Sequence, residues 1–450
     1  MKKKVLLSII IILISFLQNS CGSKRISKKI IVASSGKIES LDPARANTLK
    51  AIQLISSLGD TLYELNSDGE LIPELASGMP IISKDRLQIT INLRKNVFFH
   101  DGTAFNSNAI KFTFDRFKKI GTMNYILGNK IKSIETPSEY SVIINLNKPS
   151  SSLNGLLTSV NLTPISPTFY KQYSDKFLNE KFVGTGKYVL TSFSNEVQSI
   201  DPYLNYWGEK PLNKGINFVG YSNSSSLFGA LKSKQIDVLL SNSIDDSQRK
   251  SLNNLSKNKQ FNEGNSPFTE LSFISLKTSS YPLSNLNLRL ALAKSLNRKL
   301  ISEKVSYGLR KPSRSIIPPI LKKDNQELWP KYDYLEARRL LQKENYCNGN
   351  ILKIPLTYRS NVPTDKLIAL TWQEEIKNSL KDCIDIELNG VESTTVYKNL
   401  SLGIYTAVLL DWTGAYSDPE AYLTPLLSCN EIVDGICKKG ESVYSGSFWG

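Results

Sequence analysis

Residues 87–117, LQITINLRKNVFFHDGTAFNSNAIKFTFDRF, contain a strand pattern, a turn and a helix pattern in succession. Apolar and polar residues alternate over 87–93, which predicts a half-buried strand. A turn is expected at 101–103, and the large apolar residues within 109–117 are spaced for one face of a helix. A strand that leads through a turn into a helix indicates an α/β protein.

Segments of the same kinds lie on both sides of this stretch. We expect a strand–turn–strand unit over 62–71 and further strands at 30–33, 141–146, 236–240, 351–358, 384–388 and 406–410. We expect helices at 222–231, 335–342 and 363–380, and one capped by Asn285 with inward residues 286, 290, 293, 296 and 300. Pro355 predicts that its strand lies at a sheet edge or is interrupted. The mixture predicts mixed sheets covered by helices.

Length and composition favour a folded protein of two or three domains. The chain has 450 residues, of which 40% are hydrophobic and 22% charged. Enough apolar surface exists to offset chain entropy, which excludes disorder as the main state. The single long apolar run, at the N-terminus, excludes a polytopic membrane protein.

The charge balance and the histidine count restrict the function further. The net charge is +15, but the basic residues are scattered along the chain. An anionic membrane surface explains this charge at least as well as a nucleic acid does, and we expect no nucleic-acid partner. The only histidine is His100, in a Phe-His-Asp-Gly turn, where a structural role is favoured over catalysis. A multi-histidine metal site is excluded, and we expect no metal, no cofactor and no catalytic residues.

The N-terminus has the pattern of an export signal. A basic start is followed by an apolar run over 5–17, which is short for a membrane span and typical of a signal peptide. The following residues resemble a bacterial lipoprotein cleavage site, so we expect a signal peptide at 1–20, lipidation of Cys21 and a tether over 21–29. A plain secretory signal remains the alternative.

The other four cysteines agree with export to an oxidising compartment. Three pairings are possible. We favour the sequence-local disulfides Cys347–Cys383 and Cys429–Cys437, with free thiols as the alternative. The absence of a Cys-x-x-Cys pair argues against zinc.

Seven short motifs occur in order over nearly the whole chain. They are SLDP at 40–43, LRKNVFFHDGT at 93–103, GTGKY at 184–188, YWG at 206–208, a helix-to-strand step at 231–238, an Arg-x-Ala helix at 289–298 and WTGAYSDP at 412–419. Together they resemble the extracytoplasmic solute-binding proteins, family 5, of peptide/nickel-type ABC importers.

The resemblance implies an α/β periplasmic-binding-protein-like fold (class II), with an extra domain inserted in the first of two lobes. By analogy, 28–60 and 170–265 form lobe I, 61–169 the extra domain, and 266–450 lobe II. Members of this family continue past the GSFW at 446–449, so lobe II is expected to be incomplete and the chain to be a truncated or split gene product.

The resemblance also implies residues that contact cargo. Ser34, Ser35 and Gly36 match a segment that meets cargo backbone in such proteins. Tyr358 ends a predicted strand and Arg359 follows it, at the place where dipeptide-binding members have an arginine for the ligand carboxylate. A surface arginine is the alternative for Arg359.

The last motif lacks one expected contact. Peptide-binding members carry an aspartate for the ligand ammonium where this chain has Ala415, between Asp411 and Asp418. Asp411 remains a candidate, whereas Asp418, before a proline, fits a turn. Trp412 and Tyr416 are expected as aromatic walls of the interlobe cleft, with core packing an equally good alternative.

By resemblance, the chain is a non-catalytic receptor rather than an enzyme. It would be a monomer that captures a peptide-like or small polar solute in the periplasm, or at the outer face of the plasma membrane, held by its lipid anchor. It would deliver the solute to ABC permease subunits with cytoplasmic ATPases. Alternatives are a metal-chelate or oligosaccharide cargo, an extracytoplasmic hydrolase, and a non-functional truncated remnant.

Overall fold

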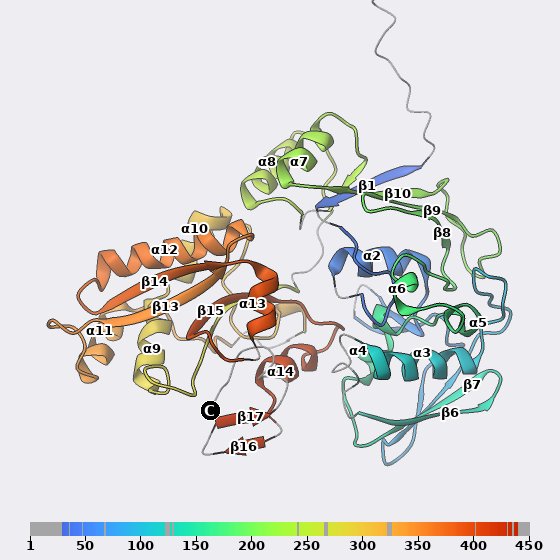
Figure 1. Ribbon diagram of the computed structural model, residues 1–450, viewed down its shortest axis with the longest axis horizontal. Coiled ribbons are helices and arrows are strands. Elements are labelled where there is room, and N and C mark those ends of the chain that lie inside the picture. The colour runs from blue at the N-terminus through green and yellow to red at the C-terminus, as the bar shows by residue number, and fades with distance from the viewer. Residues whose placement is uncertain are drawn as a thin grey trace, which may run out of the picture.

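The computed structural model describes residues 29–439, except short stretches at 36, 47, 67–68, 122–126, 128–129, 241–242, 265–268, 322–325, 401, 430 and 434–435. The expected signal peptide, Cys21 and the tether up to residue 28 lie outside the described residues. Figure 1 shows two bodies side by side, one formed by the blue-to-green half of the chain and one by the orange and red half. In the described part of the chain, no helix is both long and apolar enough to cross a membrane.

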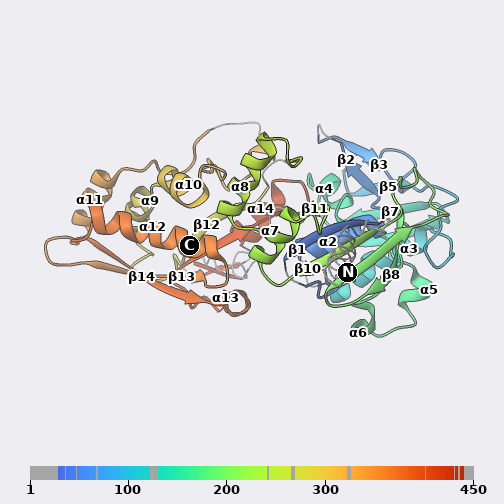
Figure 2. The same cartoon turned by 90° about the horizontal axis from the view of Figure 1, so that it is seen from above.

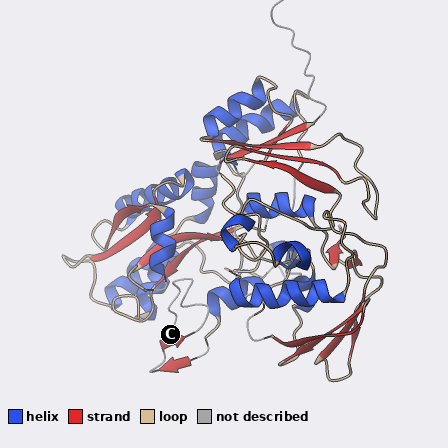
Figure 3. Cartoon of the chain, turned by 45° about the vertical axis from the view of Figure 1, so that its right-hand side comes forward, coloured by secondary structure: helices blue, strands red, loops and turns tan. Residues whose placement is uncertain are grey.

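Lobe I is built on a five-stranded mixed sheet. β1 (Ile30–Ser35) lies between β10 (Ile216–Tyr221) and β11 (Val238–Leu239) and runs parallel to both. β9 (Val197–Pro202) and β8 (Tyr188–Phe193) continue the sheet antiparallel. The helices of this lobe are α2 (Leu49–Leu58), α5 (Pro167–Tyr170), α6 (Asp175–Leu178), α7 (Ser224–Lys232) and α8 (Asp246–Lys257). Helices lie on both sides of the sheet in Figure 3, as a layered α/β unit requires.

The extra domain contains a four-stranded antiparallel sheet in the order β4-β5-β7-β6. Its elements are β2 (Tyr63–Leu65), β3 (Leu71–Pro73), β4 (Ile81–Ile82), β5 (Gln88–Asn92), α3 (Ser107–Ile120), β6 (Ile131–Ser138), β7 (Ser141–Leu146), α4 (Leu153–Leu157) and the short 3-10 helix η2 (Val160–Leu162). The side chain of Asn106 caps α3, and Ile110, Phe114 and Phe117 are buried. The strand, turn and helix of 87–117 therefore form as predicted, with the strand and helix sharing one core.

Lobe II contains a four-stranded sheet in the order β12-β15-β13-β14. Its elements are β12 (Leu271–Leu276), α9 (Leu286–Ser295), α10 (Arg298–Ser306), η4 (Pro319–Leu321), α11 (Tyr334–Lys343), β13 (Leu352–Arg359), α12 (Pro363–Ser379), β14 (Ile384–Val391), α13 (Ser393–Leu400), β15 (Ala407–Trp412), α14 (Glu420–Leu427), β16 (Glu431–Val433) and β17 (Ile436–Lys439). Seen from above, this body extends away from lobe I, with α11 at its far end (Figure 2).

A buried ion-pair cluster joins lobe I to the extra domain. The carboxylate of Asp42, in the turn after β1, accepts two hydrogen bonds of 2.6 Å from Arg116 of α3. Arg45 lies 3.0 Å from the same carboxylate, and Asp175 contacts Arg116 at 3.2 Å. Because the two arginines and two aspartates balance in charge, this cluster fixes α3 against lobe I without leaving a buried charge unpaired.

A second junction between these units contains two neighbouring carboxyl groups. Asp60 is buried and accepts hydrogen bonds from Thr185, Tyr206 and Trp207 at 2.8–3.1 Å. Burial raises the pKa of Asp60. Burial, and then the charge of Asp60, raise the pKa of Glu74 to about 7. The junction therefore binds a proton near neutral pH.

One predicted helix of lobe II is interrupted. Asn285 caps α9 as expected, but the helix ends at Ser295, and Leu286, expected to face inward, is exposed. The side chain of Asn297 accepts a hydrogen bond from the backbone N–H of Leu300 at 3.0 Å and starts α10. Two caps thus divide one helical pattern into two helices, and the prediction of a single inward face was wrong.

The prediction of an edge or interrupted strand at Pro355 was also wrong. β13 is an inner strand that runs parallel to both β14 and β15. The backbone N–H of Leu352 donates to Cys383 on the β14 side, so by alternation the nitrogen of Pro355 faces β15. The β15 pairing covers only Leu356 and Thr357. Pro355 therefore lies just outside that ladder, where its missing donor costs no strand bond.

Candidate functional site

Arg359 ends β13 and is the centre of a cluster of charged side chains. The whole residue is only 4% exposed, yet all five of its guanidinium N–H groups have acceptors. Nε and Nη2 donate to Asp365 at 2.7 and 2.9 Å, and Nη1 and Nη2 donate to Asp411 at 2.8 Å each. The last Nη1 donor bonds the hydroxyl of Tyr397 at 2.7 Å. The guanidinium is therefore saturated by its own protein.

The cluster contains two carboxyl groups for one cation. Burial is the main influence on Arg359 and would lower its pKa, but hydrogen bonds to Asp365 and Asp411 carry that pKa above its usual value. Burial raises the pKa of Asp365, against the opposing effect of Arg359. With both carboxylates ionised, the cluster keeps one surplus negative charge. An anionic ligand group would be repelled here unless it displaced a carboxylate, and a cationic group would be attracted.

Asp411 is the accessible member of the cluster. Its side chain is 34% exposed, whereas those of Arg359 and Asp365 are nearly buried. Asp411 lies near the C-terminal end of β15, which runs parallel to β13. Arg359 is the last residue of β13. The carboxyl ends of parallel strands are where open α/β sheets hold ligands. The chain that follows β15 reaches the extra domain, where Tyr416 lies against Gly155, so this sheet edge faces the other body.

The expected serine segment lies at the corresponding edge of lobe I. Ser34 and Ser35 are the last residues of β1, paired with Gly220 and Tyr221 of β10. Ser34 is buried and Ser35 is half-buried. Gly36 lies outside the described residues. In Figure 1, the arrowhead of β1 points toward lobe II, so the C-terminal end of this strand lies on the side of lobe I that faces lobe II.

The aromatic candidates have packing roles. Trp412 is partly buried and donates its indole N–H to the carbonyl of Ala421 at 2.9 Å. Tyr416 is 8% exposed and belongs to the core of the extra domain. Tyr358 is half-buried among the lobe II cores, and a Cβ at Gly390 would lie 2.8 Å from its hydroxyl oxygen. The contacts of Trp412 and Tyr416 fit the alternative of core packing, and a contact of either residue with cargo stays a prediction.

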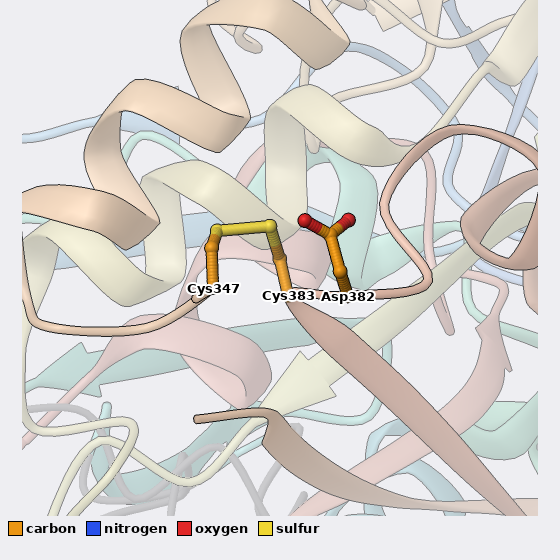
Figure 4. Close-up of side chains that lie close together, drawn as sticks. All are labelled: Cys347, Asp382 and Cys383. Atoms are coloured by element: carbon orange, nitrogen blue, oxygen red, sulfur yellow. A yellow bond between two sulfur atoms is a disulfide. The ribbon is translucent and has the colours of Figure 1, made fainter. Parts of the chain in front are cut away.

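The four cysteines form the two sequence-local disulfides, Cys347–Cys383 and Cys429–Cys437. Asp382 lies beside the first pair, close enough for three ligand atoms to surround an ion (Figure 4). The sulfurs are bonded to each other, however, and Asp382 pairs with both terminal nitrogens of Arg338 at 2.7 Å. These groups are therefore engaged in structural bonds rather than presented to a metal.

His100 sits in its predicted turn, with Nε2 2.9 Å from the carbonyl of Gly186. It lines a cavity of about 220 Å³ where lobe I meets the extra domain. Among the described residues, the lining of this cavity includes none of those expected to contact cargo. Burial lowers the pKa of His100, which favours a neutral ring that donates from Nε2.

Sequence reasoning missed two members of the charged cluster, Asp365 and Tyr397. Asp365 lies in the first turn of α12, where an acidic residue is expected for the helix dipole and gives no sign of a second role. Tyr397 comes from α13, 38 residues after Arg359. A buried arginine at a strand end implies nearby carboxylates, but only the fold identifies which ones.

Comparison with known proteins places this architecture in a family. Residues 70–434 match the model for bacterial extracellular solute-binding proteins, family 5. The glutathione-binding protein GsiB of Escherichia coli O6:K15:H31 is 27% identical over 328 residues, and GsiB of Salmonella typhimurium has the same identity and length of match. In both cases the match covers 72% of this chain and 62% of the relative, so the chain spans less than two thirds of these relatives.

Solved structures show the same fold. The Helicobacter pylori periplasmic binding protein DppA, in complex with the peptide STSA, aligns with a TM-score of 0.73 at 23% identity, covering 89% of this chain and 82% of DppA. NikZ of Campylobacter jejuni, in complex with Ni(L-His), aligns with a TM-score of 0.77 at 20% identity, covering 93% and 83%. Since the family model covers most of the sequence, the protein belongs to the bacterial extracellular solute-binding proteins, family 5.

Proposed function

We propose that this chain is the substrate-binding component of an ABC importer, which holds a small polar solute between its lobes without transforming it. The observation that carries this proposal is the position of Asp411, a half-exposed carboxylate at the strand edge of lobe II that faces the other body. Family membership supports the class of activity. The relatives are named for glutathione binding or were solved with a peptide or a nickel chelate, all polar solutes.

The cluster favours a cargo with a positively charged group. Arg359 was expected to hold the ligand carboxylate, but its donors are all engaged by Asp365, Asp411 and Tyr397. We propose that Arg359 positions Asp411 and that Asp411 contacts the cargo. A charge-assisted bond to an ammonium or guanidinium group would then supply the contact that Ala415 cannot make. Ser34 and Ser35 are proposed to meet the cargo from lobe I.

Calorimetry with three tripeptides tests the proposed cargo. We expect Lys-Ala-Lys to bind more tightly than Ala-Ala-Ala, and Glu-Ala-Glu to bind weakest. Asp411→Asn should weaken Lys-Ala-Lys by roughly 10- to 100-fold, because a hydrogen bond to a charged group contributes about 1.5–3 kcal/mol. Asp385→Asn is the matched control, since Asp385 of β14 lies opposite Lys353 in the strand ladder, at the other end of β13 from Arg359.

Other outcomes would redirect the proposal. Tightest binding by Glu-Ala-Glu would contradict the charge argument and return Arg359 to the role of ligand cation. Binding of a nickel chelate or an oligosaccharide with no peptide binding would favour the non-peptide alternative. Cleavage of a bound peptide, detected by mass spectrometry and lost in Asp411→Asn, would show a hydrolase instead.

We propose that the chain is exported, lipidated at Cys21 and associated with the permease at the membrane surface. The support is the signal-like sequence of residues 1–20 and the extracellular assignment of the family. Metabolic labelling with a fatty acid in a bacterial host should mark the wild-type chain and not Cys21→Ser. Equal labelling of both would contradict the proposed anchor.

A further inference from the structure

Lobe II touches the extra domain through residues 412–422, here called the docking segment. Within lobe II, this segment is held by the pairing of Trp412 with Leu271 of β12 and by the hydroxyl of Tyr422, which donates to the carbonyl of Thr269 at 2.7 Å. Tyr416, Ala421 and Tyr422 nevertheless share a core with the strands and helices of the extra domain. The docking segment is therefore anchored in one body and packed into the other.

An ion pair reinforces this contact. The ammonium of Lys130, just before β6 of the extra domain, lies 3.0 Å from a carboxylate oxygen of Glu420 and 3.2 Å from the hydroxyl of Tyr416. The side chains of Lys130 and Glu420 are only 12% and 28% exposed. Such partial burial reduces screening by salt and makes the pair stronger than one at the surface.

The backbones also approach closely. Gly155 lies in α4, and a Cβ placed on it would meet the ring of Tyr416 at 3.0 Å and the Cβ of Asp418 at 3.2 Å. The hydroxyl of Ser159 lies 3.5 Å from the carbonyl of Ala415. A side chain at position 155 would therefore push the docking segment away from the extra domain.

We propose that the docking segment is an interlobe latch, in which Lys130, Glu420, Tyr416 and Gly155 hold the two bodies in the arrangement seen here. Separating the bodies would expose Tyr416 and break the ion pair, so the latch favours the arrangement seen here, called closed below, before cargo arrives. These residues change the binding of cargo only by shifting the equilibrium between the closed and open arrangements of the lobes. That effect on cargo rests on the proposed function. The lobe arrangement itself can be measured without cargo.

Small-angle scattering of the full chain without cargo tests the ionic part of the latch. Lys130→Met keeps the length of the side chain and removes its charge. We expect it to lower the closed-to-open ratio by about fivefold or more and to raise the radius of gyration. Lys111→Met is the matched control, because Lys111 pairs with Asp115 on the exposed face of α3 in the same domain. The charge swap Lys130→Glu with Glu420→Lys should restore the wild-type radius.

Gly155→Val tests the close approach independently of charge. Gly229→Val is its control, since Gly229 is also helical and a Cβ there would meet no atom within 4 Å. We expect Gly155→Val alone to raise the radius of gyration and to speed amide hydrogen exchange in the docking segment. Circular dichroism checks that each variant is folded.

The proposal is overturned if folded Lys130→Met and Gly155→Val both keep the wild-type radius and exchange rates. Calorimetry on the same variants separates the two claims. If the latch variants open but neither peptides, a nickel chelate nor an oligosaccharide binds to any form, the proposed function fails while the latch stands. If peptides bind equally well to variants with an unchanged radius, the latch fails while the proposed function stands.

Discussion

Removing the charge of Asp42 should weaken the junction between lobe I and the extra domain more than any exposed ion pair does. Asp42 is fully buried and receives two 2.6 Å bonds from Arg116 and a 3.0 Å contact from Arg45. Asp42→Asn keeps the size of the side chain and can still accept from the backbone N–H of Ala44. It leaves both arginines short of a counter-charge.

The expected cost follows from breaking a buried pair. Removing one partner of a buried ion pair typically lowers the free energy of unfolding by about 3–5 kcal/mol, because the other charge stays buried without a partner. For a domain of 150–250 residues this corresponds to a melting temperature lower by roughly 6–20 °C. Thermal unfolding followed by circular dichroism measures the shift.

A control within α3 makes the Asp42 prediction specific. Asp115→Asn breaks the exposed pair with Lys111 and should cost at most about 0.5 kcal/mol. An equal and small shift for Asp42→Asn and Asp115→Asn would refute the reasoning that the buried cluster fixes α3 to lobe I.

Three further predictions concern stability. The raised pKa of Glu74, about 7 against a usual value near 4.5, means that the folded state holds an extra proton at acidic pH. The free energy of unfolding should therefore fall as pH rises from about 5 to 8. In urea titrations, Glu74→Gln should show a smaller fall over this pH range. An equal fall in the wild type and the variant would contradict the raised pKa of Glu74. Replacing Cys347 and Cys383 by serine opens a loop with a separation of 36 residues and should cost about 4 kcal/mol in urea unfolding, whereas a cost below 1 kcal/mol would show that the disulfide contributes little. Trp372→Ala, at a buried position in lobe II, should cost about 3–5 kcal/mol by the same measurement, and a near-neutral effect would contradict its place in the core.

Local patterns in the sequence predicted much of the fold. The strand at 141–146 and the helix at 363–380 form almost as expected, because alternation and helical spacing report which side chains face a core. Asn297 was not recognised as a cap because Leu296 and Leu300 continue the helical spacing of apolar residues past it, and within such a pattern a cap and a polar surface residue look alike. The inner position of Pro355 depends on how far β15 pairs with β13, which is a property of the sheet and not of the strand.

The candidate site was only partly predictable. Arg359 and Asp411 were both expected near cargo, and the structure brings them together. Their pairing with each other was not foreseen, because they are 52 residues apart and nothing local links them. Tyr416 shows the same difficulty. From the sequence, an aromatic residue in a motif can equally well line a cargo cleft or pack in a core. The contact of Tyr416 with the core of the extra domain is seen only in the structure.

The central claim is that a polar solute is held between two lobes and left unchanged. The most direct measurement combines small-angle scattering with mass spectrometry of the Lys130→Met variant, whose lobes are expected to be more open without cargo, mixed with Lys-Ala-Lys. The account predicts a smaller radius of gyration with saturating peptide and full recovery of the intact peptide. An unchanged radius despite saturation, or recovery of peptide fragments, would contradict it.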